Sequence, residues 1–279
     1  MLYVPASVAA RIEHAEASLM SGIGDAIQRR VGPEGVSVTP VGGGVAVMAG
    51  PGVPWTKVAG LGFAPLDEEA IAAVEEIFAR AGAAVRVELS SLAAPEAGML
   101  LSARGYVLSG FENVLGRRLP TDTDAVMAPD PSIVVSQTGA ADADTWLTVV
   151  ATGFLHPDVF DGPPATETTD RRDLDNIFGD LSRMPGFSQY LARREGDPAG
   201  GASMRIDAGI AQLCGAATLP AHRRRGVQTT LLRERLARAA AAGCDLAVVT
   251  TAPGSKSQEN VQRQGFELLY VRAVLLKSS

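Results

Sequence analysis

The sequence matches itself at a constant offset of 160 residues, and this repeat constrains the fold more than any other feature. At that offset Val87–Ser91 (VELSS) aligns with Ala247–Thr251 (AVVTT) without a gap. The glycine–aromatic pair Gly105-Tyr106 aligns with Gly265-Phe266 at the same offset. Any two α/β segments align loosely, but one offset that holds for a strand and for the start of the next favours a duplication. We therefore expect two similar halves.

Each half alternates helices with short strands. In the first half the pattern predicts a helix over 67–81 and strands over 44–48, 85–89 and 106–115. In the second half it predicts a helix over 227–242 and strands over 210–219, 246–250 and 266–276. A stretch rich in Pro and Asp, 120–131, separates the halves and reads as a linker. The expected domains are residues 1–125 and 126–279.

Composition restricts the function classes. With 46% hydrophobic and 20% charged residues, the chain is typical of a soluble globular protein. No apolar run approaches the roughly 18–20 residues of a membrane-spanning helix, and a net charge of −6 argues against nucleic acid or an anionic membrane as partner. Two cysteines exclude a disulfide framework and a four-ligand zinc site, so we expect no metal. The N-terminus lacks a signal-peptide pattern and the chain is rich in Ala, Gly and Arg, which indicates a bacterial cytoplasmic protein.

The segment Ala216–Leu232 carries the clearest chemical signal. A buried strand ends at Thr218–Pro220, an arginine-rich turn follows, and Gly226 precedes an amphipathic helix. Free N–H groups and the positive end of the helix dipole then point at the turn, an arrangement that binds anions and phosphates in particular. The spacing matches neither a P-loop nor a dinucleotide fingerprint. A solvated basic turn that caps a core helix is the alternative.

This segment resembles the pyrophosphate-binding motif of the GNAT N-acetyltransferase superfamily, Gln/Arg-x-x-Gly-x-Gly/Ala. Arg223–Val227 fits its first five positions, and Gln228 departs from the sixth, where Gly or Ala is usual. The side chain of Gln228 either crowds a pyrophosphate or donates a hydrogen bond to it. The short helix expected at 257–264 and the pair Gly265-Phe266 also fit the family. The resemblance covers about residues 132–279.

The resemblance implies a fold and a cofactor. The fold is α/β, with two acetyltransferase-like lobes, each a mostly antiparallel sheet with flanking helices and a splayed parallel strand pair. Acetyl-CoA binds in the gap of that strand pair, and no metal is involved. The implied cofactor-binding residues are Ala216, Ala217 and Thr218 beside the pantetheine arm, and Arg223, Arg224, Arg225, Gly226, Val227, Gln228 and Thr229 around the pyrophosphate. Asn260 either hydrogen-bonds the pantetheine or is an ordinary residue of a helix surface.

The first half reads as a degenerate copy of the second. Residues 63–69 occupy the place of residues 223–229, and they bring Asp67, Glu68 and Glu69 to the start of a helix. Three carboxylates there stabilise the helix through its dipole but repel a pyrophosphate. We expect the first half to bind no CoA and to wall the acceptor pocket of the second half.

Catalytic residues are less well marked. Many family members have a Tyr four residues before the glycine of the Gly-Phe pair, which acts as the general acid that protonates the departing thiolate. Val261 stands at that position here. The remaining candidates are the hydroxyls of Ser257 and Tyr270 and the loop pair His156 and Asp158. Each also has a purely structural interpretation, so direct attack by the amine, with water carrying the proton away, stays open.

These features predict an acetyl-CoA-dependent N-acetyltransferase that acts on the amine of a small molecule. A non-catalytic acyl-CoA-binding module is the alternative, favoured by the missing Tyr and by Gln228. A protein or peptide acetyltransferase is a third reading, and the long segment 161–185 argues mildly against it because it can cover the acceptor side. We expect a monomer whose two lobes mimic a homodimer, with 108–116 beside 268–276.

Overall fold

The computed structural model describes residues 4–119, 130–157 and 170–278. The chain divides into two compact units, of which unit 1 is Met1–Leu115, Thr250–Pro253 and Glu267–Ser279, and unit 2 is Gly116–Val249 and Gly254–Phe266. The expected domain boundary at 125/126 lies outside the described residues, as does Asp158. The last segment of the chain thus belongs to the same unit as the first half.

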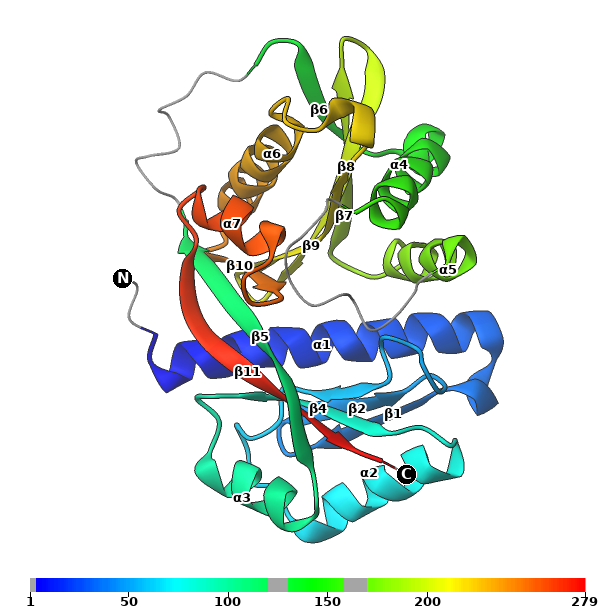
Figure 1. Cartoon of the computed structure of the whole chain (residues 1–279), viewed down its shortest axis with the longest axis vertical. Coiled ribbons are helices and arrows are strands. Elements are labelled where there is room, and N and C mark those ends of the chain that lie inside the picture. Colours follow the sequence, from blue (N-terminus) through cyan, green and yellow to red (C-terminus); the bar gives the residue numbers. More distant parts are fainter. Residues whose placement is uncertain (1–3, 120–129, 158–169, 279) are drawn as a thin grey trace. The chain divides into compact units, whose positions relative to one another are not determined.

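Unit 1 is a mixed sheet flanked by α-helices (Figure 1). Its helices are α1 (Ala6–Val31), α2 (Glu68–Arg80) and α3 (Pro95–Ala103). Its strands are β1 (Ser37–Val41), β2 (Gly44–Met48), β3 (Lys57–Ala59), β4 (Val85–Ser90), β5 (Val107–Arg118) and β11 (Glu267–Lys277). Their order in the sheet is β1-β2-β3-β4-β11-β5, and β5 runs on into unit 2 at Gly116. Only β3 and β4 are parallel among the pairs β1–β2, β2–β3, β3–β4 and β4–β11.

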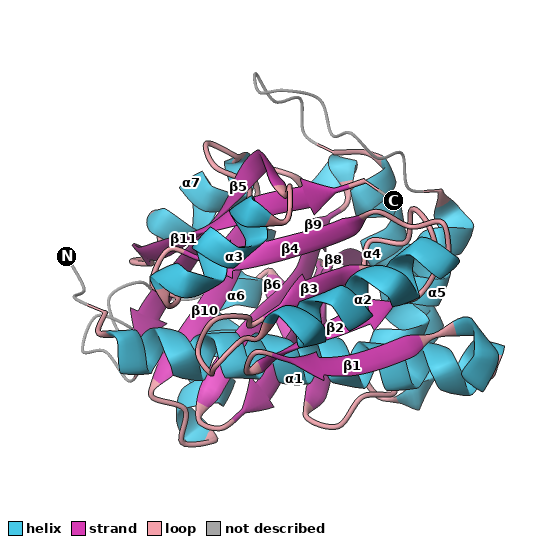
Figure 2. Ribbon diagram, turned by 90° about the horizontal axis from the view of Figure 1, so that it is seen from below, coloured by secondary structure: helices cyan, strands magenta, loops and turns pink. Residues whose placement is uncertain are grey.

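The helices of unit 1 cover both faces of its sheet. Helix α1 lies on one face and α2 and α3 on the other, and the view from below in Figure 2 shows α2 and α3 in front of the strands. Asp67 caps α2, because its Oδ1 accepts a hydrogen bond of 2.7 Å from the N–H of Ala70. The predicted apolar stripe of α2 is buried in the core at Ile71, Val74 and Phe78.

The last strand, β11, lies between β4 and β5. It pairs antiparallel with β4 from Arg272 opposite Ser90 to Lys277 opposite Val85. On its other side the hydroxyl of Ser109 donates to the carbonyl of Val274 at 3.0 Å. The expected neighbourhood of 108–116 and 268–276 is therefore confirmed, and the pairing of β11 with β4 is an addition that the sequence did not indicate.

Unit 2 is a second mixed sheet, in the order β6-β7-β8-β9-β10. Its strands are β6 (Ile133–Gln137), β7 (Phe187–Arg194), β8 (Asp197–Asp207), β9 (Ile210–Thr218) and β10 (Leu246–Thr251). Its helices are α4 (Ala143–Leu155), α5 (Arg171–Leu181), α6 (Val227–Ala241) and α7 (Lys256–Gln262). The pairs from β6 to β9 are antiparallel, and β9 with β10 is parallel.

Helices α4 and α6 pack on opposite faces of unit 2. A Cβ added at Gly200 would meet Val227 of α6 at 2.7 Å, and one added at Gly201 would meet Val150 of α4 at 2.5 Å. Because successive residues of a strand point to opposite faces, these two glycines let both helices approach β8 closely. Helix α5 packs beside α4 (Figure 1).

The second parts of the two halves contain the same elements in the same order. The pairs are α2 and α6, β4 and β10, α3 and α7, and β5 and β11, and their first residues are offset by 159 to 161 residues. Both units show the predicted fold class, a mixed α/β sheet with flanking helices. Among the described residues, no helix combines the length and the apolar character that crossing a membrane requires.

Candidate functional site

Strands β9 and β10 of unit 2 pair over only part of their length, and β9 carries a β-bulge opposite β8. The two strands pair over Ile210–Gln212 and Leu246–Val248, although β9 continues to Thr218. Opposite β8, the register shifts between Gly201 and Ser203, so that Gly215 and Ala216 together face Ala202. Gly215 has φ +33°, and an extra residue of this kind bends the strand that carries it. The parallel pair is thus splayed toward its carboxyl end, as expected.

The corresponding pair in unit 1 stays together. Strands β3 and β4 are paired at Val58 and Ala59, the last two residues of β3. Lys57 Nζ donates to Glu88 Oε2 at 2.8 Å, and both side chains are buried. Glu16 lies 3.9 Å from the same ammonium. A buried ion pair therefore bridges the two parallel strands of unit 1.

The arginine-rich turn of unit 2 is held in an unusual backbone conformation. Arg224 and Gly226 have φ values of +59° and +82°, in the left-handed region. A residue other than glycine is strained there, and such strain is typical of ligand-binding turns. Helix α6 begins directly afterwards, and Thr230 donates the first intrahelical hydrogen bond, 3.0 Å long, to the carbonyl of Gly226. The earlier N–H groups of α6 have no acceptor in the helix and are oriented for an anion.

Arg223 joins this turn to the end of α4. Its Nη2 donates to the backbone carbonyl of His156, the residue that ends α4. The side chains of Arg224 and Arg225 are exposed at the turn. The structure therefore brings the candidate His156 next to the predicted anion site and leaves two arginines at the surface of that site.

Gln228 and Asn260 contact each other. Asn260 Nδ2 of α7 donates to Gln228 Oε1 of α6 at 3.0 Å, and both residues are half-buried. Ser257, also on α7, is exposed, and Val261 is buried in the core. Gln228, which departs from the motif, is thus hydrogen-bonded to another predicted cofactor-binding residue.

Two buried polar atoms at this site lack a hydrogen-bond partner among the described residues. They are Thr218 Oγ1, at the end of β9, and His222 Nδ1, at the start of the turn. Buried polar atoms are nearly always paired, so a hydroxyl without a partner at the end of the splayed strand indicates a place for a polar ligand. The half-buried backbone of Ala216 and Ala217 leads up to it.

Tyr270 has a different environment. It lies in β11 of unit 1, where its hydroxyl donates to Glu13 Oε1 at 2.6 Å. Burial, and after it the charge of Glu13, raises the pKa of Tyr270 well above its usual value. Glu13 also accepts from Arg272 Nε at 2.8 Å. Tyr270 is thus part of a buried ionic network of unit 1, which the sequence does not reveal because a charged residue such as Glu13 reads as exposed.

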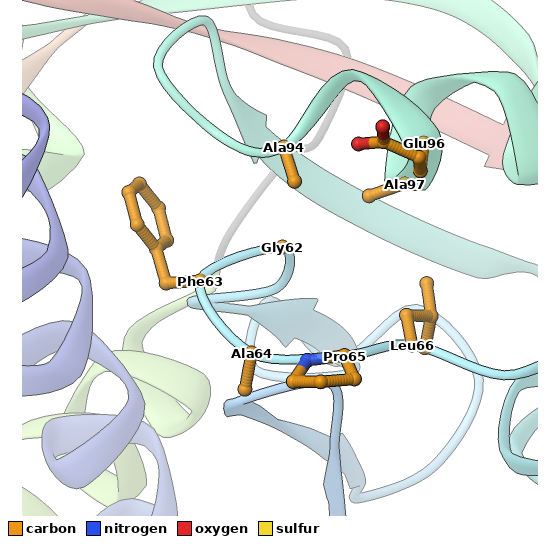
Figure 3. A pocket seen from close by; sticks show the side chains of 8 residues that line it. All are labelled: Gly62, Phe63, Ala64, Pro65, Leu66, Ala94, Glu96 and Ala97. Carbon is orange, nitrogen blue, oxygen red and sulfur yellow. The ribbon is translucent and has the colours of Figure 1, made fainter.

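A cavity of about 460 Å³ lies in unit 1 at the place that matches the arginine-rich turn (Figure 3). It is lined by Gly62, Phe63, Ala64, Pro65, Leu66, Ala94, Glu96 and Ala97. Shifted by 160 positions, these are residues 222–226, 254, 256 and 257. The cavity of unit 1 has an apolar wall and one carboxylate where the turn of unit 2 has three arginines.

The bulge at Gly215 is the part of the site that sequence reasoning missed. A glycine inside a predicted strand is the signal that points to a bulge.

Among the described residues, no group of three or more His, Cys, Asp or Glu side chains is arranged to hold a metal ion.

Comparisons with known proteins agree on one fold. The sequence model of the acetyltransferase (GNAT) family matches residues 155–266. A solved GCN5-related N-acetyltransferase from Kribbella flavida superimposes with a TM-score of 0.60 and 18% identity, over 94% of this chain and 95% of its own. A tandem GNAT protein from the clavulanic acid biosynthesis pathway superimposes with a TM-score of 0.62 and 14% identity, over 91% of this chain and 87% of its own. A GCN5-related N-acetyltransferase from Sphaerobacter thermophilus superimposes with a TM-score of 0.55 and 14% identity, over 84% of this chain and 72% of its own. No curated protein sequence matches the chain.

Proposed function

Since the chain carries a domain of the acetyltransferase (GNAT) family over residues 155–266, we propose that it transfers the acetyl group of acetyl-CoA to an amine of a small molecule. One observation carries the proposal. The left-handed turn at Arg224 and Gly226 presents the N-terminus of α6 next to the end of a splayed, bulged strand. Phosphate-binding N–H groups and an open strand edge are what a long cofactor with a pyrophosphate and an amide-rich arm requires.

The described residues fit this cofactor. The pyrophosphate would take the first N–H groups of α6 and the side chains of Arg224 and Arg225. The pantetheine arm would lie along the backbone of Ala216–Thr218, where the unpartnered hydroxyl of Thr218 is available. Asn260 would contact the same arm from α7. Bound there, acetyl-CoA supplies the activated thioester.

His156 is our candidate for the proton transfer. An amine attacks a thioester only in its neutral form, so a nearby base assists by taking a proton from the ammonium group. An imidazole suits this task near neutral pH. Arg223 fixes the position of His156 through its backbone carbonyl, while the imidazole stays exposed to an incoming amine. We assign Tyr270 a structural role because Glu13 accepts its hydrogen bond.

We propose that the first half is a duplicated copy that binds no CoA. Its counterpart of the turn lines an apolar cavity with one carboxylate, which offers a pyrophosphate no cation. The ion pair of Lys57 with Glu88 also bridges the strands between which the thioester would have to enter. One cofactor per chain is therefore expected, in a monomer with a solution mass near 28.9 kDa.

Calorimetric titration with acetyl-CoA, followed by thiol release with a panel of small-molecule amines, tests the proposal. We expect one binding site per chain and turnover with at least one amine. Tight binding without turnover on any acceptor would favour an acyl-CoA-binding module instead. Lack of acetyl-CoA binding would overturn both.

A further inference from the structure

Three buried side chains donate hydrogen bonds to the backbone around the bulge of β9. Trp146 Nε1 of α4 donates to the carbonyl of Ala202 at 3.2 Å, and Ser203 Oγ donates to the carbonyl of Cys214 at 3.1 Å. Arg235 Nη1 of α6 donates to the carbonyl of Ser203 at 3.0 Å. All three donors come from residues that are at most 3% exposed.

These donors stand where the ladder of backbone hydrogen bonds is interrupted. The register shift falls between Gly201 and Ser203, so the carbonyls of Ala202, Ser203 and Cys214 border the break. A buried carbonyl without a donor destabilises the structure that contains it, so side chains that satisfy these groups favour the bulged register over other registers. The bulge is therefore fixed from both faces of the sheet, by α4 and by α6.

Arg235 is a charged side chain buried in the core, where its desolvation is unfavourable. It has no carboxylate partner among the residues that the structure describes, and its Nε donates to the carbonyl of Leu231 at 3.2 Å. Burial lowers its pKa to about 10. An apolar side chain of similar volume packs as well and avoids the cost of a buried charge. The guanidinium therefore serves something other than packing, and the carbonyl that it reaches belongs to the bulge.

Gly215 completes the arrangement. A Cβ at this position would lie 2.8 Å from Phe178 Cε1 of α5, and Phe178 itself packs edge-on against Trp146. The aromatic pair thus occupies the space above the bulge and leaves room only for a glycine.

We propose that Ser203 and Arg235 are positioning residues, which hold the bulge and thereby place the backbone of Ala216–Thr218 for acetyl-CoA. The inference rests on the proposed function. It assigns to two buried residues outside the arginine-rich turn a role in cofactor affinity rather than in stability alone.

The test compares four variants by urea unfolding, acetyl-CoA titration and amide hydrogen exchange of the ligand-free protein. Ser203→Ala and Arg235→Met each remove one donor, and Arg235→Lys keeps one. Arg205→Met is the matched control, because Arg205 is also buried and bridges β8 and β9 through Gln212 at 2.8 Å, in the regular part of the ladder.

We expect Ser203→Ala and Arg235→Met to raise the dissociation constant of acetyl-CoA about tenfold and to speed exchange at Ala216–Thr218. Arg235→Lys should restore most of the affinity. Arg205→Met should lower the urea midpoint without changing the affinity. Wild-type affinity and exchange in folded Ser203→Ala and Arg235→Met proteins would overturn the inference, and so would an equal loss of affinity in Arg205→Met.

Different measurements would contradict the proposed function and this inference. If the wild-type protein binds no acetyl-CoA, the proposed function is wrong. The exchange rates of the ligand-free variants still decide whether Ser203 and Arg235 hold the bulge, since unchanged rates would contradict it.

Discussion

Glu112 in β5 and Arg272 in β11 stand at matching positions of the two halves, 160 residues apart, and Arg272 Nη1 lies 3.9 Å from Glu112 Oε2. Two identical strands related by a twofold axis would place like side chains against each other at such a point. Here an acidic side chain faces a basic one. Opposite charges stabilise the contact between the two strands, whereas like charges would destabilise it. Matching positions of the two halves thus carry complementary charges within unit 1.

Arg272 is also the centre of the buried network of unit 1, and its removal tests that role. Arg272→Ala would leave the buried Glu13 without its cation, so we expect a loss of roughly 3–5 kcal/mol in the free energy of unfolding. Urea denaturation followed by circular dichroism measures it. Arg80→Ala is the control, because the pair of Arg80 with Glu76 is exposed and should contribute less than about 1 kcal/mol. Similar values for the two variants would contradict the assignment.

The sequence predicted the positions of single helices and strands well, but it did not predict which strands pair with each other. The helix expected at 67–81 and the strand at 266–276 lie within a residue or so of α2 and β11, because periodicity and caps act over a few residues. The pairing of β11 with β4 depends on contacts between residues far apart in the chain, which no local pattern encodes. Glu13 was missed for a related reason, since a charged residue reads as exposed unless its partner is known.

The candidate site also has a part that the sequence predicts and a part that only the folded chain shows. The turn before α6 could be predicted from the sequence because it is built from consecutive residues, and the anion site proposed there rests on the same short stretch. The donors at the bulge come from α4, β8 and α6, so only the folded chain brings Trp146, Ser203 and Arg235 together.

The stability of unit 1 should depend on pH through Glu75. Arg104 donates two hydrogen bonds to its carboxylate, and these, with Lys277, hold the pKa of Glu75 below its usual value. A lowered pKa in the folded state stabilises the protein above the unfolded value of about 4.3, and the contribution is lost as the pH falls through the folded value.

We therefore expect Glu75→Gln to cost about 1–3 kcal/mol at pH 7 and progressively less below about pH 4. Unfolding free energies of both proteins across this range measure the difference. Glu76→Gln, next in the chain and exposed, should show little cost at any pH. A pH-independent difference for Glu75→Gln would count against the charge-assisted bonds.

Gly226→Glu should abolish acetyl-CoA binding. The substitution brings a carboxylate to the place proposed for the pyrophosphate, and like charges repel. Folding should survive, because an added Cβ would meet only Ile133 Cδ1, at 3.6 Å, among the described atoms.

Gly226→Ala carries the same backbone strain at φ +82° without the charge, so it separates strain from repulsion. Asp67→Ala, at the matching helix start of unit 1, should leave the affinity unchanged and cost about 0.5–2 kcal/mol of stability through the lost cap. Wild-type affinity in a folded Gly226→Glu protein would remove the main support of the proposed function.

Arg224→Ala should weaken acetyl-CoA binding by about 1–3 kcal/mol, the loss of one charge-assisted contact. The side chain is exposed and its backbone is left-handed, so it is held at the turn without being part of the core. Calorimetry at two salt concentrations should show a smaller salt dependence in the variant. Arg238→Ala, an exposed arginine near the far end of α6, is the control and should bind like the wild type.

The contact of Gln228 with Asn260 makes the departure from the family motif testable. With Asn260 Nδ2 donating to Gln228 Oε1, the amide group of Gln228 keeps its own N–H donors, and the carbonyl of Asn260 keeps an acceptor. The donors suit a phosphate oxygen and the acceptor suits an amide N–H of pantetheine. We therefore expect Gln228 to assist binding rather than to crowd the cofactor.

A double-mutant cycle measures this. Gln228→Ala, although it restores a residue usual in the motif, should weaken acetyl-CoA binding about threefold to tenfold, because it removes a donor and releases Asn260. Asn260→Ala should weaken binding similarly, and the double variant should lose less than the sum of the two free energies. Acetyl-pantetheine, which lacks the pyrophosphate, should still report the loss at Asn260. Tighter binding by Gln228→Ala would show that the side chain crowds the site, and additive losses would show that the hydrogen bond between the two residues has no part in holding the cofactor.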